Sequence, residues 1–374
     1  MRLLQLSQTL NRKMGGFATA LYPLHGHILS SGHGSDLLGL DADLGDQESV
    51  PRLYSFEPHL LPRFYYSRSY GIQAEQFARE CDSIHVHGLW VYPNLVAGQL
   101  SRKLHKPLVI HPHGMLEPWA MKRGVYKKSV MRMLFENQNF RDAALWRALT
   151  EAEAAQIKHY CPQANVVTLP NGIMAGDFEG PVSALDLTAK HPELFNKKWI
   201  VFLSRLHQKK GLDLLVKAWS KLHRDFPGWQ LVIAGGDDGY GDILHQMIDS
   251  CDLRKRVTLL GLVHGNEKAA LLKNAQLFVL PSRSEGFSMA VLEALAAGLP
   301  VLITHNCNFP EVDAVGAGKI VEASEPSIEE GLRNLLGLPE YYLDEMGQKG
   351  ATLVREKYTW EKIASQMVGA LEKL

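Results

Sequence analysis

Short hydrophobic runs recur along the chain, and most are followed by a segment with helical periodicity. Apolar runs bounded by polar turns are typical of strands buried on both faces, and their alternation with helices indicates a parallel sheet covered by helices. One predicted helix carries an apolar stripe at the helical period, made of Leu212, Leu215, Val216, Trp219 and Leu222. The pattern predicts strands at 3–6, 83–86, 108–111, 145–150 and 166–169, and then at 199–203, 231–234, 257–260, 277–280 and 301–304.

The stretch between Asn171 and Lys198 interrupts this rhythm, because it is rich in glycine and proline and has no sustained period. A chain of 374 residues is also too long for one ordinary core. We therefore predict an N-terminal Rossmann-like domain over 1–172, a linker over 173–196 and a C-terminal Rossmann-like domain over 197–359. A final helix over 360–374 follows, which the pattern alone assigns to neither domain. Ligands bind beyond the carboxyl ends of parallel strands, so two such sheets can face each other across a cleft.

One part of the first domain departs from the pattern. The segment 33–62 is acidic between Asp36 and Glu48 and is predicted to be irregular, without strands. The helix expected after Gly15 and Gly16 contains Pro23 and Gly26, which are predicted to kink or shorten it.

Composition narrows the class of protein. The formal net charge is zero, from 40 basic and 40 acidic residues, so no global field attracts nucleic acid. The four cysteines form no CxxC pair, which indicates reduced thiols. No apolar stretch approaches the ~20 residues of a membrane-spanning helix, and the N-terminal run looks like a strand and not a signal peptide. These features predict a cytoplasmic protein, or one peripheral on the cytoplasmic face of a membrane.

The segment after Leu280 has the features of an anion site. A polar loop leads into a predicted helix over 288–297, which Gly298 and Pro300 terminate. The first backbone N–H groups of a helix have no partner within it, and the helix dipole adds positive potential. The amides of Phe287, Ser288 and Met289 are therefore predicted to bind a diphosphate.

A second anion signal lies in the loop after the strand at 199–203, where Arg205 and Lys210 precede Gly211. Arginine makes planar multi-donor contacts with phosphate and lysine supplies a compact charge, so the pair would neutralise a diphosphate without a metal. Alternatively, both are solvated loop charges. The helix that carries Glu285 and Glu293 at its start and interior favours the diphosphate interpretation.

Two histidine pairs lie at strand ends of the first domain, His85 with His87 and His111 with His113. Alternation places each pair on one face of the sheet, so four imidazoles could converge on a metal. The charges of Arg205 and Lys210 make a metal unnecessary, and we expect none.

These motifs resemble the donor site of retaining glycosyltransferases of family 4, which have the GT-B fold. The most specific part of the resemblance lies between Glu285 and Val301, and the rest extends over nearly the whole chain. The segments that carry it are Gly15-Gly16, His113-Gly114, Pro170-Asn171-Gly172, Ser204-Arg205, Lys210-Gly211, Glu285-Gly286-Phe287-Ser288, Leu292-Glu293-Ala294, Gly298-Leu299-Pro300-Val301, Phe309-Pro310-Glu311 and Trp360-Glu361.

The resemblance implies a role for each motif. Arg205 and Lys210 would bind the donor diphosphate, Glu285 the hydroxyls of the transferred sugar and Glu293 the ribose. His113 would donate a hydrogen bond to that sugar, and the final helix would pack back on the first domain. The remaining donor contacts would come from the backbone near Gly15 and Gly16, from Gly286, Phe287, Ser288 and Met289, and, beside the base, from Gly261, Leu262 and Val263.

The reaction that the resemblance implies is transfer of a hexose-type sugar, with retention, from a UDP- or GDP-sugar. The acceptor would be a hydroxyl of a glycan or lipid-linked saccharide, in cell-surface polysaccharide or lipopolysaccharide biosynthesis. Because no side chain stands out as a nucleophile, front-face attack is favoured over attack by Glu285. Candidate acceptor contacts are His87, Trp90, Tyr92 and Trp119, while His85 and His111 would be structural.

The stretch 119–135 is both basic and rich in apolar residues. Such a helix can lie on an anionic membrane, where a lipid-linked acceptor would be found. Alternatively, its apolar side belongs to the core and its basic side is solvated.

Three other classes of protein compete with this interpretation. A sugar-nucleotide epimerase or hydrolase, or a glycogen-synthase-like polymerase, could use the same fold. A dinucleotide-dependent oxidoreductase should carry G-x-G-x-x-G after the first strand, and Met14-Gly15-Gly16-Phe17 does not supply it. A non-catalytic sugar-nucleotide-binding protein would be expected to lack Arg205, Lys210 or Glu293, all of which are present.

Overall fold

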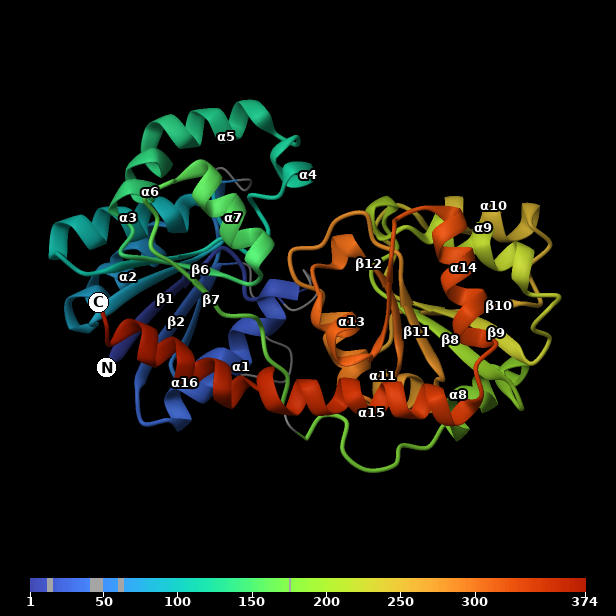
Figure 1. Cartoon of the computed structure of the whole chain (residues 1–374). Coiled ribbons are helices and arrows are strands. Elements are labelled where there is room, and N and C mark those ends of the chain that lie inside the picture. Colours follow the sequence, from blue (N-terminus) through green and yellow to red (C-terminus); the bar gives the residue numbers. More distant parts are fainter. Residues whose placement is uncertain (12–15, 41–49, 60–63, 175) are drawn as a thin grey trace. The chain divides into compact units, whose positions relative to one another are not determined.

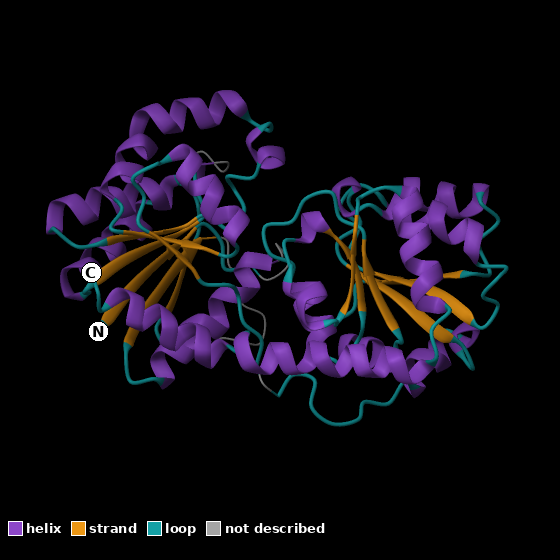
Figure 2. Cartoon of the chain, in the orientation of Figure 1, coloured by secondary structure: helices purple, strands orange, loops and turns teal. Residues whose placement is uncertain are grey.

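The chain folds into two α/β units in this computed structural model, which describes residues 1–11, 16–40, 50–59, 64–174 and 176–374. Unit 1 comprises Met1–Gly172 and Trp360–Leu374, and unit 2 comprises Ile173–Thr359. Each unit contains one sheet of parallel strands with helices on both of its faces (Figures 1 and 2).

Within the described part of unit 1 the sheet has seven strands in the order β3-β2-β1-β4-β5-β6-β7. The chain leaves β1 toward β2 on one side and returns to β4 on the other, and ligands bind at the carboxyl edge of such a reversal. The strands are β1 (Arg2–Ser7), β2 (Gly34–Leu40), β3 (Leu53–Phe56), β4 (Ser83–His87), β5 (Leu108–His111), β6 (Leu145–Ala148) and β7 (Val166–Thr168). The helices are α1 (Gly16–Ser30), α2 (Arg68–Glu80), α3 (Tyr92–Leu104), α4 (Pro118–Met121), α5 (Val125–Met131), the π-helical turn η3 (Arg132–Glu136), α6 (Asn137–Asp142), α7 (Glu151–Tyr160) and α16 (Trp360–Leu371).

Unit 2 has a six-stranded sheet in the order β10-β9-β8-β11-β12-β13, counted over the residues described. Its strands are β8 (Lys198–Leu203), β9 (Trp229–Ala234), β10 (Val257–Gly261), β11 (Leu277–Leu280), β12 (Val301–Thr304) and β13 (Gly318–Val321). Its helices are α8 (Leu185–Lys190), η4 (Pro192–Leu194), η5 (Gln208–Lys210), α9 (Leu212–Leu222), α10 (Gly241–Ser250), α11 (Gly265–Asn274), α12 (Met289–Ala296), η6 (His305–Cys307), α13 (Glu311–Val315), α14 (Glu325–Leu336) and α15 (Glu340–Lys357).

All ten predicted strands are present, and their ends lie within two residues of the prediction. The central strands are buried along their whole length, which explains why they read as continuous apolar runs. The five residues of the α9 stripe are confirmed as fully buried core positions. Burial of side chains of this size contributes roughly 1.5–3 kcal/mol each, so α9 is a main anchor of the second sheet.

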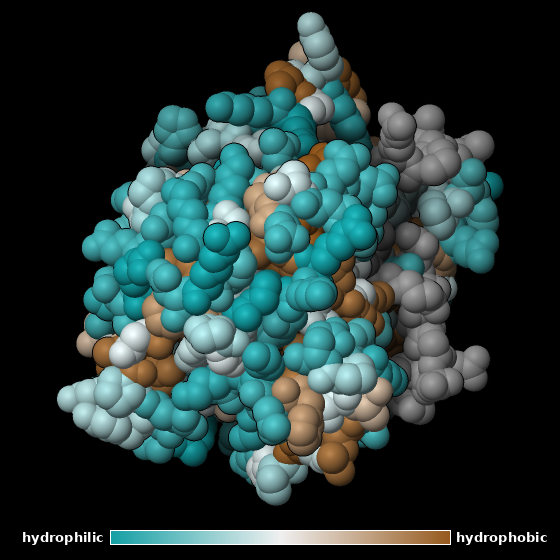
Figure 3. Space-filling view, turned by 90° about the vertical axis from the view of Figure 1, so that its right-hand side faces the viewer, coloured by the Kyte–Doolittle hydropathy of each residue, from teal (hydrophilic) through white to brown (hydrophobic). Residues whose placement is uncertain are grey.

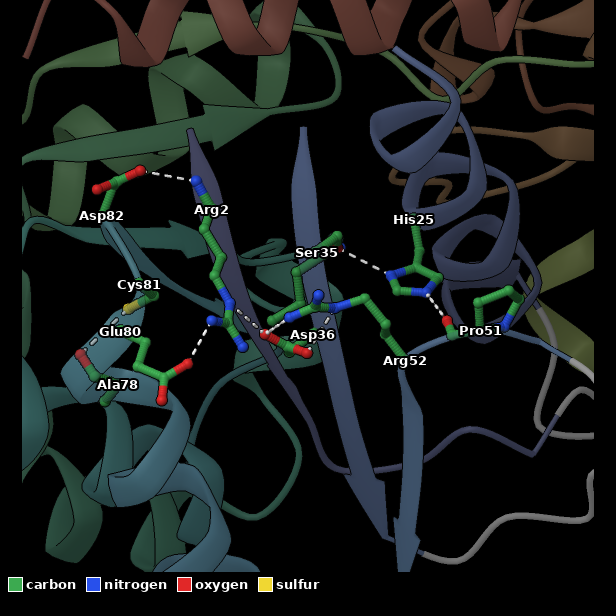
Figure 4. A network of polar contacts seen from close by, with 11 residues as sticks. Arg2, His25, Ser35, Asp36, Pro51, Arg52, Ala78, Glu80, Cys81 and Asp82 are labelled. Atoms are coloured by element: carbon green, nitrogen blue, oxygen red, sulfur yellow. Dashed lines mark hydrogen bonds and ion pairs between the residues drawn. The ribbon is translucent and has the colours of Figure 1, made fainter. Parts of the chain in front are cut away.

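The prediction of an irregular segment at 33–62 was wrong where the structure describes it, because β2 and β3 lie there. Asp36 looked like a loop residue, yet it is fully buried in β2, where Arg2 and Arg52 neutralise it (Figure 4). The acidic residues at 41–49 lie outside the described residues. Strand β13 was also missed, since its short GKIV run is only partly apolar and partly buried.

Helix α1 was expected to be kinked or shortened, but it is assigned as one helix of 15 residues with Pro23 inside it. Its residues Leu24 and Ile28 pack in one core cluster with Trp360, Ile363 and Met367 of α16. Packing of an apolar face commonly outweighs helix propensity, which explains the error. Figure 1 shows α16 running along α1 within unit 1.

The surface is mainly polar on the face that Figure 3 shows, and hydrophobic residues form small separate patches there. Within the described ranges, no helix combines the length and the apolar character needed to cross a bilayer.

Candidate functional site

The predicted anion site lies at the start of α12 in unit 2. Strand β11 ends at Leu280, and α12 begins nine residues later at Met289, close to the predicted position. Ser288 is the N-cap, and its hydroxyl accepts a hydrogen bond from the Val291 amide at 3.4 Å. The other first-turn amides of the helix have no partner within it. The positive end of the helix dipole therefore lies next to the loop 281–288.

A buried ion pair lies in this loop. Lys210 Nζ donates to Glu285 Oε1 at 2.6 Å, and the Ser282 hydroxyl donates to the same oxygen at 2.6 Å. Both charged residues are less than 10% exposed. Burial alone would raise the pKa of Glu285, but the charges of Lys210 and Lys209 and the two hydrogen bonds outweigh it and lower the pKa. Glu285 is therefore an ionised carboxylate that can only accept hydrogen bonds.

Backbone contacts fix the position of the pair. The Glu285 amide donates to the Asn306 carbonyl at 3.0 Å, and Asn308 Nδ2 donates to the Glu285 carbonyl at 2.5 Å. The Arg283 amide donates to the Lys209 carbonyl at 2.7 Å. The loop after β11 is thus tied to the loop after β8 on one side and to the segment after β12 on the other.

Two glycines allow the strand ends to approach closely. Gly211 has φ 71°, and a Cβ there would lie 2.0 Å from the Pro281 carbonyl oxygen. Gly235 has φ 148°, and a Cβ there would lie 1.8 Å from the Ser204 carbonyl oxygen. Both distances are far inside van der Waals contact, so only glycine fits at either position.

Arg205 occupies a different environment from Lys210. Its side chain is half exposed, and Nη1 donates to Asp238 Oδ2 at 2.6 Å. The two basic residues predicted to bind the diphosphate are therefore each held by a separate carboxylate, one buried and one near the surface. The sequence did not reveal Asp238 as a partner.

Glu293 lies within α12 and forms a second ion pair with a residue that the sequence analysis missed. Lys268 Nζ, from α11, donates to Glu293 Oε1 at 2.7 Å. The Glu293 side chain is 18% exposed and that of Lys268 is 31% exposed, so the pair is accessible. Glu285 and Glu293 are both ion-paired, and the Glu293 side chain is the more exposed of the two, at 18% against 7%.

The predicted base contacts follow β10. Gly261 has φ 69° with open space where a Cβ would be, Leu262 is 58% exposed and Val263 is buried. Of these three residues, only Leu262 therefore has a side chain that a ligand could contact. Of the remaining predicted donor contacts, Phe287 packs on Phe309 and Tyr358, and Gly286 and Met289 are half-buried.

The four histidines of unit 1 lie close to one another, and alternation had placed each pair on one face of the sheet. His85 Nδ1 lies 3.1 Å from His111 Nε2, and His87 Nδ1 lies 3.0 Å from His113 Nε2. The His87 ring also stacks on His111, with 4.2 Å between ring centroids. Burial, together with the charge of Arg147, lowers the pKa of His113 and of His85 to about 3. Burial and the neighbouring histidines, with a smaller effect of Arg147, lower the pKa of His87 and of His111 well below the ordinary value. All four rings are neutral at physiological pH.

Ligand atoms of His87, His111 and His113 lie within 4.8 Å of one another, and these three are the one candidate metal-binding group among the residues that the structure describes. Neutral imidazole is the form that binds metals. In this structure, however, the His87 and His113 nitrogens point at each other at hydrogen-bonding distance.

The loop that carries His113 is held by Glu153, a residue that no motif indicated. His113 and Gly114 both have left-handed backbone, with φ 53° and 78°. The Gly114 amide donates to Glu153 Oε1 at 2.6 Å, and the Leu149 amide donates to Oε2 at 2.7 Å. Burial raises the pKa of Glu153 despite these two bonds. This buried side chain therefore fixes the loop after β5.

The predicted acceptor residues differ in exposure. Trp90 belongs to the core of unit 1 and packs on Phe140, so an acceptor contact from its ring is not supported. Tyr92 is half-buried beside Tyr66, and Trp119 is half-buried with the Arg123 guanidinium 3.8 Å from its ring centroid. Gly15 lies outside the described residues, and Gly16 is the first residue of α1.

The stretch 119–135 forms α4, α5 and most of η3, and its apolar residues are divided between core and surface. Phe135 is buried, and Met121 and Met131 pack on the core of unit 1, whereas other apolar residues are exposed. Tyr126 is 91% exposed, Met133 75% and Leu134 64%. Val125 and Val130 are also exposed. The alternative that this apolar side is core is therefore wrong for these five positions.

A cavity of about 510 Å³ in unit 2 lies at the other end of α12, lined by Ala296, Ala297 and Gly298 together with Phe178 and Thr352. An eight-residue helix is about 12 Å long, so this cavity is separate from the N-terminal anion site.

Comparison with known proteins gives matches over both units. Residues 14–175 match the model of Glycosyltransferase Family 4, and residues 186–351 match that of Glycosyl transferases group 1. An uncharacterized glycosyltransferase of Methanocaldococcus jannaschii is 26% identical over 380 aligned positions, covering 96% of this chain and 94% of that protein. A GDP-mannose-dependent alpha-(1-6)-phosphatidylinositol monomannoside mannosyltransferase of Mycobacterium tuberculosis is 30% identical over 219 positions, which is 56% of each protein. The chain thus spans only about half of that second relative.

Two solved structures have the same fold. Anabaena HepE in complex with UDP and glucose superposes with a TM-score of 0.80 at 20% identity and covers 100% of both chains. Sucrose-phosphate synthase from Thermosynechococcus elongatus gives 0.78 at 18% identity, covering 100% of this chain and 99% of that one. The two family matches and this fold agree with the motifs at the start of α12. The chain belongs to the family 4 glycosyltransferases of GT-B fold and is a transferase enzyme.

Proposed function

We propose that this enzyme transfers a hexose-type sugar, with retention, from a UDP- or GDP-sugar to a hydroxyl of a glycan or lipid-linked saccharide. Cell-surface polysaccharide or lipopolysaccharide biosynthesis is the proposed setting. The observation that carries the proposal is the buried Lys210–Glu285 pair in front of the α12 N-terminus. A GDP-mannose-dependent relative and a fold neighbour in complex with UDP and glucose support a nucleotide-sugar donor and leave both bases open.

The Lys210–Glu285 pair can bind a diphosphate leaving group. A lysine ammonium has three donors, and Glu285 takes one of them, so two remain for phosphate oxygens. Arg205 and the helix N-terminus add positive potential where negative charge develops, which is electrostatic stabilisation of the transition state. We propose that these groups act without a metal ion.

Glu285 is proposed to bind hydroxyls of the transferred sugar and not to attack it. Its carboxylate oxygen Oε1 is already engaged by Lys210 and Ser282, which lowers its nucleophilicity. Front-face attack, in which the leaving phosphate takes the acceptor proton, then needs no enzyme nucleophile. Glu293, held by Lys268, is proposed to accept hydrogen bonds from the ribose, with Leu262 beside the base.

Unit 1 is proposed to supply the acceptor site and His113, which contacts the transferred sugar. Tyr92 and Trp119 remain acceptor candidates, whereas the buried His87 and Trp90 do not. The backbone near Gly15 and Gly16 is proposed to approach the donor.

Binding of a nucleotide sugar should raise the melting temperature. Ligand at 100 times its Kd stabilises the folded state by about 2.7 kcal/mol, which corresponds to about 5–10 °C for a unit of this size. We expect such a shift with one UDP- or GDP-hexose, measured by thermal unfolding, and release of the nucleoside diphosphate only when an acceptor is added. Glu293→Ala should weaken donor binding at least tenfold.

The matched control is Glu329→Ala, which removes an ion-paired glutamate of α14 in the same unit and should leave donor binding unchanged. Release of free sugar without acceptor, or isomerisation of the sugar, would identify a hydrolase or epimerase instead. Binding without turnover on any acceptor would favour a non-catalytic sugar-nucleotide-binding protein. If no nucleotide sugar shifts the melting temperature, the proposed donor site is wrong.

We also propose that α5 and η3 contact an anionic membrane and so place a cytoplasmic enzyme at its lipid-linked acceptor. Exposed Tyr126 and Met133 lie among lysines and arginines.

Each basic residue near an anionic surface contributes about 1 kcal/mol to membrane binding. The double change Lys122→Ser, Lys127→Ser should therefore weaken co-sedimentation with phosphatidylglycerol vesicles roughly thirtyfold. The control, Lys362→Ser with Lys373→Ser, removes two exposed lysines elsewhere in unit 1. Equal losses in both variants would contradict a localised surface.

A further inference from the structure

One face of the unit 1 sheet buries a run of polar side chains that the proposed chemistry does not require. Gln5 of β1, Ser35 of β2 and His87 of β4 are each at most 1% exposed. In the strand register Gln5 lies opposite Leu37 and His85, so Gln5, Ser35 and His87 all project from the same face. Buried polar groups are costly unless every donor meets an acceptor, so their hydrogen bonds can be traced completely.

The run begins at a backbone carbonyl. Figure 4 shows the ring of His25, on α1, between Ser35 and Pro51. His25 Nε2 lies 2.8 Å from the Pro51 carbonyl oxygen, which can only accept a hydrogen bond, so Nε2 carries the proton. Burial lowers the pKa of His25, so the ring is neutral and its Nδ1 is an acceptor. The Ser35 hydroxyl, 2.8 Å away, therefore donates to Nδ1.

The next link fixes the orientation of Gln5. The Ser35 hydroxyl has one proton, and His25 receives it, so Ser35 can only accept from Gln5 Nε2 at 2.7 Å. A flipped Gln5 amide would set its oxygen against the Ser35 oxygen with no proton between them. Gln5 Oε1 is therefore directed at His87 Nε2, at 3.2 Å, and His87 Nε2 must donate.

The last link reaches His113. The groups whose charge or titration bears on His87 are His113, His85 and Arg147; with burial, all three lower its pKa, so its ring is neutral. Because Nε2 of His87 carries the proton, its Nδ1 is an acceptor. His113 Nε2, 3.0 Å away, then donates to it. The only tautomer of neutral His113 that satisfies the run has its proton on Nε2 and a lone pair on Nδ1.

We propose that this hydrogen-bonded run, from the Pro51 carbonyl through His25, Ser35, Gln5 and His87, holds His113 as the Nε2–H tautomer, so that Nδ1 is its acceptor atom. Gln5 is the positioning residue that sets the direction. The functional meaning rests on the role of His113 proposed above: Nδ1, which is buried in this structure, can accept a hydrogen bond from a sugar hydroxyl that reaches it but cannot donate one, in contrast to the role that the family resemblance implies. A neutral acceptor adds no positive charge beside the oxocarbenium character of the transition state, where an imidazolium would be unfavourable.

The test is long-range ¹H–¹⁵N NMR of the histidine side chains in the full chain, which separates protonated from unprotonated ring nitrogens. His113→Asn and His87→Asn assign the signals by their disappearance. We expect His113 and His87 each to show a protonated Nε2 and an unprotonated Nδ1 at neutral pH. A proton on His113 Nδ1 in the wild-type protein would overturn the proposal.

Two variants test the direction of the run. Gln5→Met keeps the length of the side chain but removes the acceptor for His87, and Ser35→Ala removes the hydroxyl that orients Gln5. Either change should convert the single tautomer of His113 into a mixture, visible as a shift of its Nδ1 signal away from the unprotonated position. The control is Ser83→Ala, because among the described residues the Ser83 hydroxyl bonds to the neighbouring pair alone, through His85 Nε2 at 2.9 Å. It should move the His85 signals and leave His113 unchanged.

Kinetics separates this inference from the proposed function. Gln5→Met should lower kcat about tenfold, the size of effect expected for one misdirected hydrogen bond, with donor binding within twofold of wild type. If the tautomer becomes mixed but kcat is unchanged, the run is supported and the proposed role of His113 falls. If the His113 signals do not move in either Gln5→Met or Ser35→Ala, with Ser35→Ala folded by its melting curve, the run does not set the tautomer.

Discussion

Replacing Lys210 with methionine should reduce kcat/KM by about 10²–10³-fold, the loss seen when one preorganised donor to a developing negative charge is removed. The same change should destabilise unit 2 by about 3–5 kcal/mol, because it leaves the Glu285 carboxylate buried without its counter-charge. Both effects follow from one contact of 2.6 Å, and they are measured by steady-state kinetics and by thermal unfolding.

The double variant Lys210→Met, Glu285→Gln separates the two effects. A neutral amide needs no counter-charge, so most of the stability should return while turnover stays low. Lys221→Met, which removes a solvent-exposed lysine paired with Glu325, is the matched control and should change neither property appreciably. Turnover by Lys210→Met within threefold of wild type would exclude a catalytic role for the pair.

The pair also predicts the direction of a pH effect. The folded pKa of Glu285 lies below the ordinary value. Its contribution to stability is therefore fully present above the pKa of the unfolded carboxyl and is lost as the pH falls through the lower, folded pKa. Lys210→Met, which removes that counter-charge, should show a weaker loss of stability in this acidic range.

The strands could be predicted from the sequence because their signal is local. A short apolar run such as 277–280 or 301–304 needs no distant partner to be recognised, and both were located at their observed ends. Strand β2 failed for the opposite reason. Asp36 is compatible with a buried strand only because Arg2, 34 residues before it, and Arg52, 16 residues after it, neutralise it. The residues next to Asp36 in the sequence do not indicate these ion pairs.

The candidate site shows the same division. Lys210 and Glu285 were assigned to loops after strands, where parallel sheets bind ligands, and they lie there. Their mutual contact spans 75 residues, and periodicity carries no information about it. The partners Lys268, Glu153 and Asp238 belong to no motif and lie near the site only through tertiary packing.

The histidines fall between these cases. Alternation along β4 and β5 predicted that four rings share one face of the sheet, and they do. Which ring contacts which depends on the register that pairs His87 with His111, and the sequence does not fix that register. Gln5 and Ser35 were not selected at all, since a single polar residue in an apolar strand gives no signal of its hydrogen-bond partner.

Of the glycine-to-alanine substitutions in the donor-site loops, Gly235→Ala should destabilise unit 2 the most. Its φ of 148° is a backbone conformation that residues with a side chain rarely adopt, and the new Cβ would lie 1.8 Å from the Ser204 carbonyl oxygen. Backbone strain and overpacking cost about 1–3 kcal/mol each, and no rotamer change relieves a clash with backbone. We expect a loss of about 3–5 kcal/mol, seen as a fall of roughly 6–20 °C in the melting temperature of unit 2.

Gly239→Ala isolates the conformational part of this effect. Gly239 also follows β9 and has φ 80°, but nothing lies within 4 Å of its added Cβ, so only the left-handed backbone is penalised, by about 1–2 kcal/mol. The difference between the two variants therefore measures how closely the end of β9 approaches Ser204, next to Arg205. Equal melting temperatures for Gly235→Ala and Gly239→Ala would mean that this approach is looser than the structure shows. The loop of Arg205 would then not be held by the end of β9, and a preorganised diphosphate site at this edge of the sheet would lose its structural basis.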